Sequence, residues 1–278
     1  MRIDAHQHYW EINKGYYDWI NPSEETLYQD YQPDDLSKNL QSNKIKQTIA
    51  VQASPLLEDT QYLLQLSEKN DSIAGVVGWV DLLSDTFKED LGKWKQHPKF
   101  VGIRVMIQDM ENAAVILNKE YVDSFIYLES KQIPVDLLIR EKQLPDIVHL
   151  LNRVPSLKAV VDHMAKPDIA SGDIEFWKRY LGEVASFENV YCKVSGLVTE
   201  AKQEWKREDF TPYIQHAVQV FGVDRVLFGS DWPVCLLAAT YDEVIEIVEE
   251  ALSTQCKEQE MGKLFGANAA KFYGLTNP

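Results

Sequence analysis

The stretch KQTIAVQASPLLEDTQYLLQLSEK (46–69) joins two segments that have different apolar patterns. Residues 46–53 are rich in β-branched and small apolar residues, which is typical of a strand buried in a sheet. In residues 58–69, Leu66 follows Tyr62 by four positions and Leu63 by three, so these side chains share one face of a predicted helix. A strand followed by a helix is the unit from which parallel α/β folds are built.

The same order of segments recurs along the chain. A second predicted helix, SDTFKEDLGKW (84–94), places Phe87, Leu91 and Trp94 on one face, and Ser84 is its expected N-cap. Strand-like runs occupy residues 2–6, 46–53, 73–80, 100–107, 133–138, 157–163, 190–196 and 225–231. This alternation predicts a (β/α)₈ barrel that takes up residues 1–278 as a single domain. A doubly wound sheet is the competing fold, but no glycine-rich phosphate loop follows the first strand.

The longest connection follows the first strand. The segment EINKGYYDWINPSEETLYQDYQP (11–33) is rich in tyrosine and lacks a clear helical period. At the top of a barrel such a segment would form a lid or a pocket wall. A packed surface loop is the other interpretation, and the composition of the segment fits both.

Charge and cysteine content limit the function. The chain has 28 Lys and Arg against 43 Asp and Glu, a net charge of −15, which disfavours nucleic acid and anionic membranes as partners. The cysteines, Cys192, Cys235 and Cys256, are odd in number and lack metal-site spacing. No apolar run approaches the length of a membrane helix, and no secretion signal begins the chain. We therefore expect a cytoplasmic enzyme with free thiols, acting on a small molecule, as a monomer or a homo-oligomer.

Unusual polar residues lie at the ends of three predicted strands. His6 and His8 end the first strand with their rings on one side, His163 follows the run 157–163, and Asp231 ends the run 225–231. Active sites of such barrels lie at the carboxyl ends of the strands, so these side chains are expected to converge. A single histidine at a strand end is usually structural, and we assign structural or solvated roles to the remaining ones, His97, His149 and His216. The convergence of four groups is the signal for function.

Arg104 is a further candidate. In FVGIRVMIQD (100–109), Val101, Ile103, Val105 and Ile107 share the face expected to pack on helices. Arg104 then points into the barrel, where a guanidinium needs a carboxylate or an anionic ligand. Two interpretations are open: an ion pair with Asp136 on the next strand, or hydrogen bonds from the guanidinium to a carbonyl or carboxylate of the substrate. Lys193 in VYCKVSG (190–196) raises the same question.

Several motifs together resemble those of the amidohydrolase superfamily, and more closely those of its sugar-lactonase branch. These motifs are IDAHQHYW (3–10), YDWI (17–20), VGIRVMIQ (101–108), VVDHMAKP (160–167), YCKVSGLVTEA (191–201), FGSDWPVC (228–235) and GANAAKFYGL (266–275). That branch includes L-fuconolactonases, L-rhamnonolactonases and aromatic-derived lactone hydrolases. The resemblance implies a metal-dependent-hydrolase type of barrel and a carboxylic ester hydrolase of carbohydrate metabolism.

The metal content implied by the resemblance has two versions. Binuclear members use a carboxylated lysine or a glutamate on the fourth strand and a histidine on the fifth, whereas this chain has Arg104 and Gln108 on the fourth and no histidine in PVDLLIR (134–140). A paired-metal site is therefore not expected. His6, His8, His163 and Asp231 could hold one divalent ion, with zinc the best match, or could act without a metal.

The resemblance also implies roles for the candidate residues in opening a lactone such as L-fucono- or L-rhamnono-lactone. Asp231 would be the general base for water, and His6, His8, His163 and Arg104 would stabilise the oxyanion. The expected substrate-binding residues are Trp10, Gln52, Trp79, Gln108 and Trp232. The alternatives are a metal-dependent decarboxylase of the same superfamily and a non-catalytic barrel that binds sugar acids.

Overall fold

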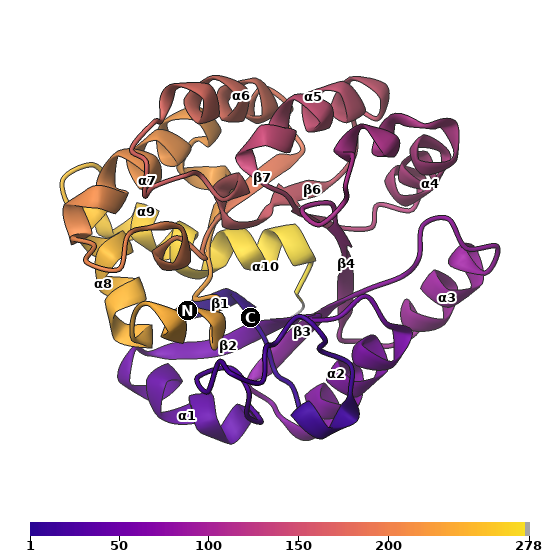
Figure 1. The fold of residues 1–278 in the computed structure, drawn as a ribbon, viewed down its shortest axis with the longest axis horizontal. Coiled ribbons are helices and arrows are strands. Elements are labelled where there is room, and N and C mark those ends of the chain that lie inside the picture. The colour runs from indigo at the N-terminus through magenta and orange to yellow at the C-terminus, as the bar shows by residue number, and fades with distance from the viewer. Residues whose placement is uncertain (276–278) are drawn as a thin grey trace.

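The computed structural model describes residues 1–275 and contains one sheet of eight parallel strands in the order β1 to β8. The strands are β1 Arg2–Gln7, β2 Ile45–Val51, β3 Ile73–Gly78, β4 Phe100–Met106, β5 Val135–Leu138, β6 Ala159–Val161, β7 Val190–Val194 and β8 Val226–Phe228. Just beyond β8, the backbone N–H of His8 donates to the carbonyl oxygen of Trp232 (2.7 Å), which brings the last strand to the first. The predicted (β/α)₈ barrel is confirmed (Figure 1).

Helices surround this sheet in the same order as the strands (Figure 1). They are α1 Pro33–Ser42, α2 Leu57–Lys69, α3 Phe87–Trp94, α4 Lys119–Ser130, α5 Leu144–Arg153, α6 Glu175–Ala185, α7 Arg207–Phe221, α8 Tyr241–Leu252, α9 Glu258–Gly262 and α10 Asn268–Tyr273. Phe87, Leu91 and Trp94 are buried as predicted. The N-cap prediction was wrong: α3 begins at Phe87, because Ser84 forms a preceding turn in which its hydroxyl accepts from Thr86 N–H (3.1 Å).

Apolar side chains fill two layers. One layer lies between strands and helices and includes Ile103 and Val105 of β4, as predicted. The other layer fills the barrel interior and includes Val160, Leu227 and Phe272. Val101 was expected to face the helices but packs against the interior layer, because the pairing of β3 with β4 shifts register between Val76 and Val77.

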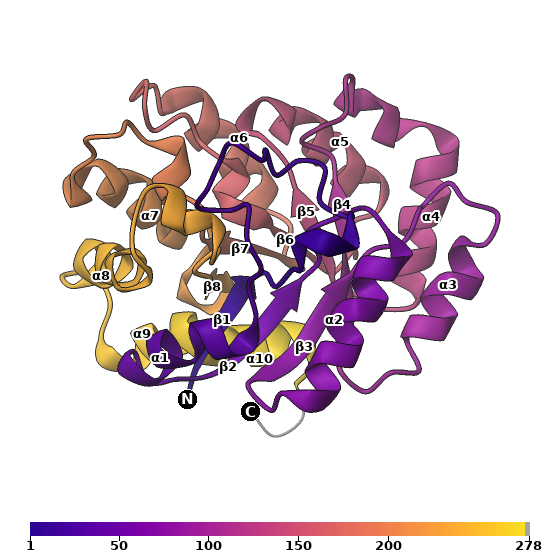
Figure 2. The ribbon, with the colours of Figure 1, turned by 60° about the horizontal axis from the view of Figure 1, so that its bottom comes forward.

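The two ends of the barrel differ. Helix α10 lies across the end at which the N-terminus is found (Figure 2), and its Phe272 and Tyr273 pack against the interior layer. The segment between β1 and α1, indigo in Figure 2, lies toward the opposite end. The strand ends that carry His6, His163 and Asp231 lie at the end of the barrel opposite α10. Helix α10 therefore closes the barrel below the candidate site. Within residues 1–275, no helix combines the length and the apolar character that crossing a membrane requires.

Candidate active site

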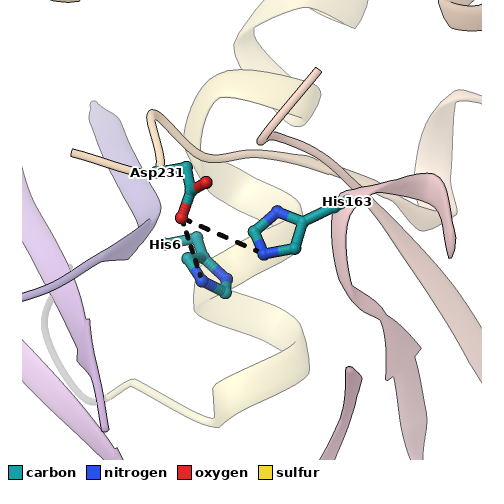
Figure 3. A group of neighbouring side chains, drawn as sticks. All are labelled: His6, His163 and Asp231. Carbon is teal, nitrogen blue, oxygen red and sulfur yellow. Dashed lines mark ion pairs between the residues drawn. The ribbon is translucent and has the colours of Figure 1, made fainter. Parts of the chain in front are cut away.

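Three histidines converge on one carboxylate oxygen. His6 lies in β1, His8 just after it, His163 just after β6, and Asp231 three residues after β8. The Nε2 atoms of His6, His8 and His163 lie 3.7, 3.3 and 3.9 Å from Oδ1 of Asp231. Figure 3 shows the His6 and His163 rings facing this carboxylate from different strands. The structure therefore brings together the four groups whose convergence the strand ends predicted.

The first and last strands are tied together beneath these groups. The buried carboxylate of Asp4 accepts hydrogen bonds from the backbone N–H of His6 (3.1 Å), the backbone N–H of Ser230 (2.9 Å) and the hydroxyl of Tyr241 (2.9 Å). The backbone N–H of Asp231 donates to the carbonyl oxygen of His6 (2.8 Å). Asp231 has a φ of 59°, a left-handed conformation that non-glycine residues rarely adopt. These bonds hold its carboxylate against the histidines.

A second unusual backbone segment carries His163. The residues His163, Met164, Ala165 and Lys166 have φ values of 54°, 51°, 64° and 49°. Each left-handed residue costs roughly 1–2 kcal/mol, so such a run persists only where its surroundings enforce it. The Trp177 indole N–H donates to the carbonyl oxygen of Met164 (2.6 Å), and Lys166 N–H donates to that of His163 (2.8 Å). The turn places both His163 and Lys166 on the wall of one cavity.

Burial and mutual charge determine the protonation of the cluster. Burial alone would raise the pKa of Asp231, but His163 and His8 beside it hold this pKa well below its usual value, so the carboxylate is ionised. Burial, and next the Lys193 ammonium, hold the pKa of His6 well below 6.5. Nδ1 of His163 lies 2.9 Å from the hydroxyl oxygen of Ser195. An ionised carboxylate therefore faces the neutral imidazoles of His6 and His163.

The stability of the protein should depend on pH through His163. Burial lowers the pKa of His163 from 6.5 to about 4, although Asp231 opposes the shift. Between pH 4 and 6.5 the unfolded chain binds a proton at this residue that the folded protein does not. The free energy of unfolding is therefore highest above pH 6.5 and decreases as the pH falls toward 4. The shift corresponds to roughly 3 kcal/mol at about 1.4 kcal/mol per pKa unit.

We therefore expect the free energy of unfolding of H163Q to fall less steeply between pH 6.5 and 4 than that of the wild type. Urea denaturation at intervals across this range measures the slope. H149Q provides the control, because His149 is exposed and lies outside the cluster. Parallel curves for H163Q and wild type would contradict the assignment.

Gly196 has no side chain, and this leaves space for His163 and Asp231. It has a φ of 59°, and a Cβ added there would lie 2.5 Å from Nδ1 of His163 and 3.0 Å from Oδ2 of Asp231. Because small displacements of catalytic groups are costly, G196A is expected to lower kcat about 10²-fold. The control is G172A, since Gly172 has a φ of 75° but nothing within 4 Å of its added Cβ. Equal losses in the two variants would show that backbone strain alone is responsible.

A cavity of about 490 Å³ opens onto the cluster. Its lining includes His8, His163, Asp231, Arg104, Met106, Gln108, Asp109, Leu138 and Lys166, together with Tyr16, Asp18 and Trp19 from the segment after β1 and Ala53, Ser54 and Pro55 after β2. The pocket-wall interpretation of residues 11–33 therefore holds for part of that segment. Trp19 is held there by its indole N–H, which donates to the carbonyl oxygen of Ala53 (2.8 Å).

Four of the expected substrate-binding residues do not line this cavity. The described lining residues include Gln108 but not Trp10, Gln52, Trp79 or Trp232. Trp10 and Trp232 are buried and pack edge-on against Tyr31, so they support the pocket wall from behind. Gln52 is fully buried and presents its backbone carbonyl, and Trp79 lines a separate surface hollow. The aromatic residues at the cavity are Tyr16 and Trp19, which the strand-end criterion missed because they lie in a loop.

Arg104 is buried and lines the cavity, as predicted. The candidate partner Asp136 pairs instead with Lys193, while Arg104 donates to the carbonyl oxygen of Gln52. The guanidinium is thus not neutralised by a direct carboxylate contact within the described residues. Burial lowers the pKa of Arg104 from 12.5, but nearby carboxylates oppose this shift, and arginine stays charged in proteins.

The histidines assigned to structural roles lie away from the cluster. His97 lies 3.2 Å from Oε1 of Glu68, His216 packs on Trp177, and His149 is exposed. None of them lines the cavity among the described residues.

The cluster fits a single metal ion. One ligand atom from each of His6, His163 and Asp231 lies within 4.8 Å of the others. Nε2 of His6 is buried and has no hydrogen-bond partner among the described residues. Two imidazoles and a carboxylate suit zinc with positions left open. His8, expected in the same set, lies outside this compact group, although its Nε2 remains 3.3 Å from Asp231.

Comparisons with known proteins agree with this geometry. The family profile described as Amidohydrolase matches residues 3–275. L-fucono-1,5-lactonase of Burkholderia ambifaria is 36% identical over 285 residues, which cover 100% of this chain and 97% of that protein. L-rhamnono-gamma-lactonase of Scheffersomyces stipitis is 26% identical over 63% of this chain and 59% of its own length. The crystal structure of an amidohydrolase from Burkholderia multivorans with bound zinc superposes with a TM-score of 0.93 at 35% identity, covering 99% of this chain and 100% of that one.

Proposed function

The chain belongs to the amidohydrolase family, and from this premise we propose that it is a lactonase that opens a sugar-acid lactone such as L-fucono-1,5-lactone. The observation that carries the proposal is the placement of three imidazole nitrogens within 3.9 Å of one ionised carboxylate oxygen, at a point where His8, His163 and Asp231 line a cavity. The match to an L-fucono-1,5-lactonase over the full chain supports the substrate class.

The reaction requires a nucleophilic water and a polarised ester carbonyl. Asp231 is ionised and takes a proton from the water whose oxygen attacks the carbonyl carbon. Negative charge then develops on the carbonyl oxygen, where the Arg104 guanidinium and an Nε2–H group of His163, both on the cavity wall, stabilise it. When the ring C–O bond breaks, the proton held by Asp231 passes to the departing oxygen. The product is a hydroxy acid, which releases a proton to solvent.

His8 and His163 are held in position by their other ring nitrogens. Nδ1 of His8 lies 2.8 Å from the carbonyl oxygen of Val51, which can only accept, so this nitrogen carries the proton in the hydrogen bond. Nδ1 of His163 lies 2.9 Å from Oγ of Ser195, which can donate or accept. Both rings thereby keep Nε2 directed at the carboxylate of Asp231.

If a divalent ion is bound, His6, His163 and Asp231 are the residues that would hold it. A metal there supplies Lewis-acid polarisation of the carbonyl, which adds to the cationic surroundings that Arg104 already provides. An ester carbonyl is reactive enough for the protein groups alone to activate it. Treatment with a chelator therefore tests how much of the rate depends on metal.

The cavity has groups suited to a polyhydroxylated ring. The exposed carboxylates of Asp18 and Asp109 can accept hydrogen bonds from hydroxyls, and the amide of Gln108 can donate or accept them. Trp19 offers an aromatic face at the wall. A planar aromatic dicarboxylate would be repelled by the two acids, which favours a neutral sugar lactone as substrate.

A pH-indicator assay with a panel of lactones tests the proposal. We expect proton release with L-fucono- or L-rhamnono-lactones, and little with lactones that lack ring hydroxyls. The assay is run on metal-free and zinc-loaded protein. Release of CO₂ from a hydroxybenzoate would indicate a decarboxylase instead, and binding of sugar lactones without turnover would indicate a non-catalytic binding protein.

A further inference from the structure

A buried group of charges lies directly beneath His6. Lys193 of β7, Asp136 of β5 and Asp162 just after β6 are all fully buried. The Lys193 ammonium forms an ion pair with Asp136 and lies 3.1 Å from Oδ1 of Asp162 and 3.2 Å from Nδ1 of His6. The Tyr273 hydroxyl of α10 anchors Asp136 through Oδ1 (2.8 Å) and Oδ2 (3.0 Å). The reaction outlined above makes no direct use of this group.

Lys193 occupies the position that a cation would take. His6, Asp136 and Asp162 form a second set of ligand atoms that lie within 4.8 Å of one another. The Lys193 ammonium contacts all three members of this set. The side chain of Lys193 therefore supplies a tethered cation where a second metal ion could otherwise be coordinated.

The contact between Lys193 and His6 specifies a tautomer. An ammonium group has only donors, so at 3.2 Å it can form a hydrogen bond only to an Nδ1 that carries a lone pair. The ring proton of neutral His6 is then on Nε2, the nitrogen that faces Asp231. Asp162 offers the competing arrangement, because its Oδ1 lies 3.4 Å from the same Nδ1, but neither of its carboxylate oxygens makes a hydrogen bond to a described residue.

We propose that Lys193 is a positioning residue that holds His6 in the Nε2–H tautomer, so that the Nε2–H group of His6 is directed at the carboxylate of Asp231 and His6 is a poor metal ligand. The consequence for Asp231 as general base rests on the proposed lactonase function; the tautomer itself does not. Both tautomers are neutral, and only the position of one proton differs.

In this arrangement Nε2 of His6 can either bind a metal ion or donate a hydrogen bond, but not both. A divalent ion at Nε2 of His6 needs the lone pair of that nitrogen, so the ring proton must move to Nδ1. There it would be donated to Oδ1 of Asp162, 3.4 Å away, and the hydrogen bond from Lys193 would be lost. The ammonium therefore opposes the metal-binding tautomer, whereas Asp162 favours it.

Nitrogen NMR of metal-free protein labelled with ¹⁵N-histidine tests the proposal. The His6 signals are identified by their loss in H6Q, and the chemical shifts distinguish the protonated from the unprotonated ring nitrogen. We expect Nε2–H in the wild type and conversion to Nδ1–H in K193M. Zinc affinity, measured by competition with a chelating dye, should rise at least tenfold in K193M.

The control is K158M, because Lys158 precedes β6 and lies over Phe272 at the closed end of the barrel. It should leave the His6 tautomer and zinc affinity unchanged. Should K193M fail to fold, K193Q removes the same ammonium with a smaller change in polarity. An Nδ1–H tautomer in the wild type would overturn the proposal. So would retention of Nε2–H in the Lys193 variant, even with tighter zinc binding, because removal of a charge would then explain the affinity. Absence of lactonase activity would instead contradict only the proposed function.

Discussion

Replacing Asp231 with asparagine is expected to lower kcat on the best lactone by about 10³-fold or more. Asn keeps the size of the side chain and tolerates the left-handed backbone of this position, where φ is 59°. It cannot take a proton from water, so the general-base contribution is lost. Initial rates from the pH-indicator assay, over a range of lactone concentrations, measure kcat and KM separately.

Asp109 provides the matched control for this substitution. It is also a carboxylate on the cavity wall, but it is exposed and forms no ion pair with the three histidines. D109N is expected to change KM for a hydroxylated lactone and to leave kcat within a few-fold of wild type. A D231N variant with a kcat within tenfold of wild type would show that another group activates water. Thermal unfolding of both variants establishes that neither loss is due to misfolding.

Much of the fold could be predicted because its signals are local. Each strand is a short apolar run, and the predicted runs contain the central residues of all eight observed strands. The convergence of His6, His163 and Asp231 could also be predicted, because parallel strands in a barrel bring their carboxyl ends to one face. These inferences required the order of segments and no knowledge of side-chain packing.

The remaining features depend on contacts between segments far apart in the chain. Arg104 and Asp136 are paired in register between β4 and β5, yet Asp136 forms its ion pair with Lys193 of β7. Strand periodicity shows which side chains point inward but not which of several inward charges will meet. The left-handed turn that brings Lys166 to the cavity is likewise enforced by a distant residue, Trp177 of α6. No pattern in DHMAKP (162–167) predicts it.

Aromatic residues were the least predictable part of the site. Trp10 and Trp232 flank strand ends, but their indole rings are covered by the segment after β1, which contributes Tyr31 to the contact. Trp19 lies on that covering segment and therefore reaches the cavity. A long loop without periodicity gives no basis for deciding which of its aromatic residues face inward.

Replacing Arg104 with alanine is expected to lower kcat about 10²- to 10³-fold with a smaller change in KM. The guanidinium lines the cavity, is buried, and has no direct carboxylate partner among the described residues, so its charge is available to the oxyanion. Loss of one preorganised donor at an oxyanion typically costs this much. A lactone carbonyl gains its charge only in the transition state, so binding of the neutral substrate should suffer less than turnover.

Chemical rescue distinguishes this role from a structural one. Guanidinium chloride at low concentration should restore part of the kcat of R104A, because the small cation can enter the space left by the side chain. Lys166 offers the comparison, since it is the other cation among the described lining residues and its ammonium makes no hydrogen bond to a described residue. We expect K166M to weaken binding of the hydroxy-acid product and to show no rescue. A raised KM with unchanged kcat in R104A would place the guanidinium in substrate binding, and Arg104 would then stabilise the ground state and the transition state equally.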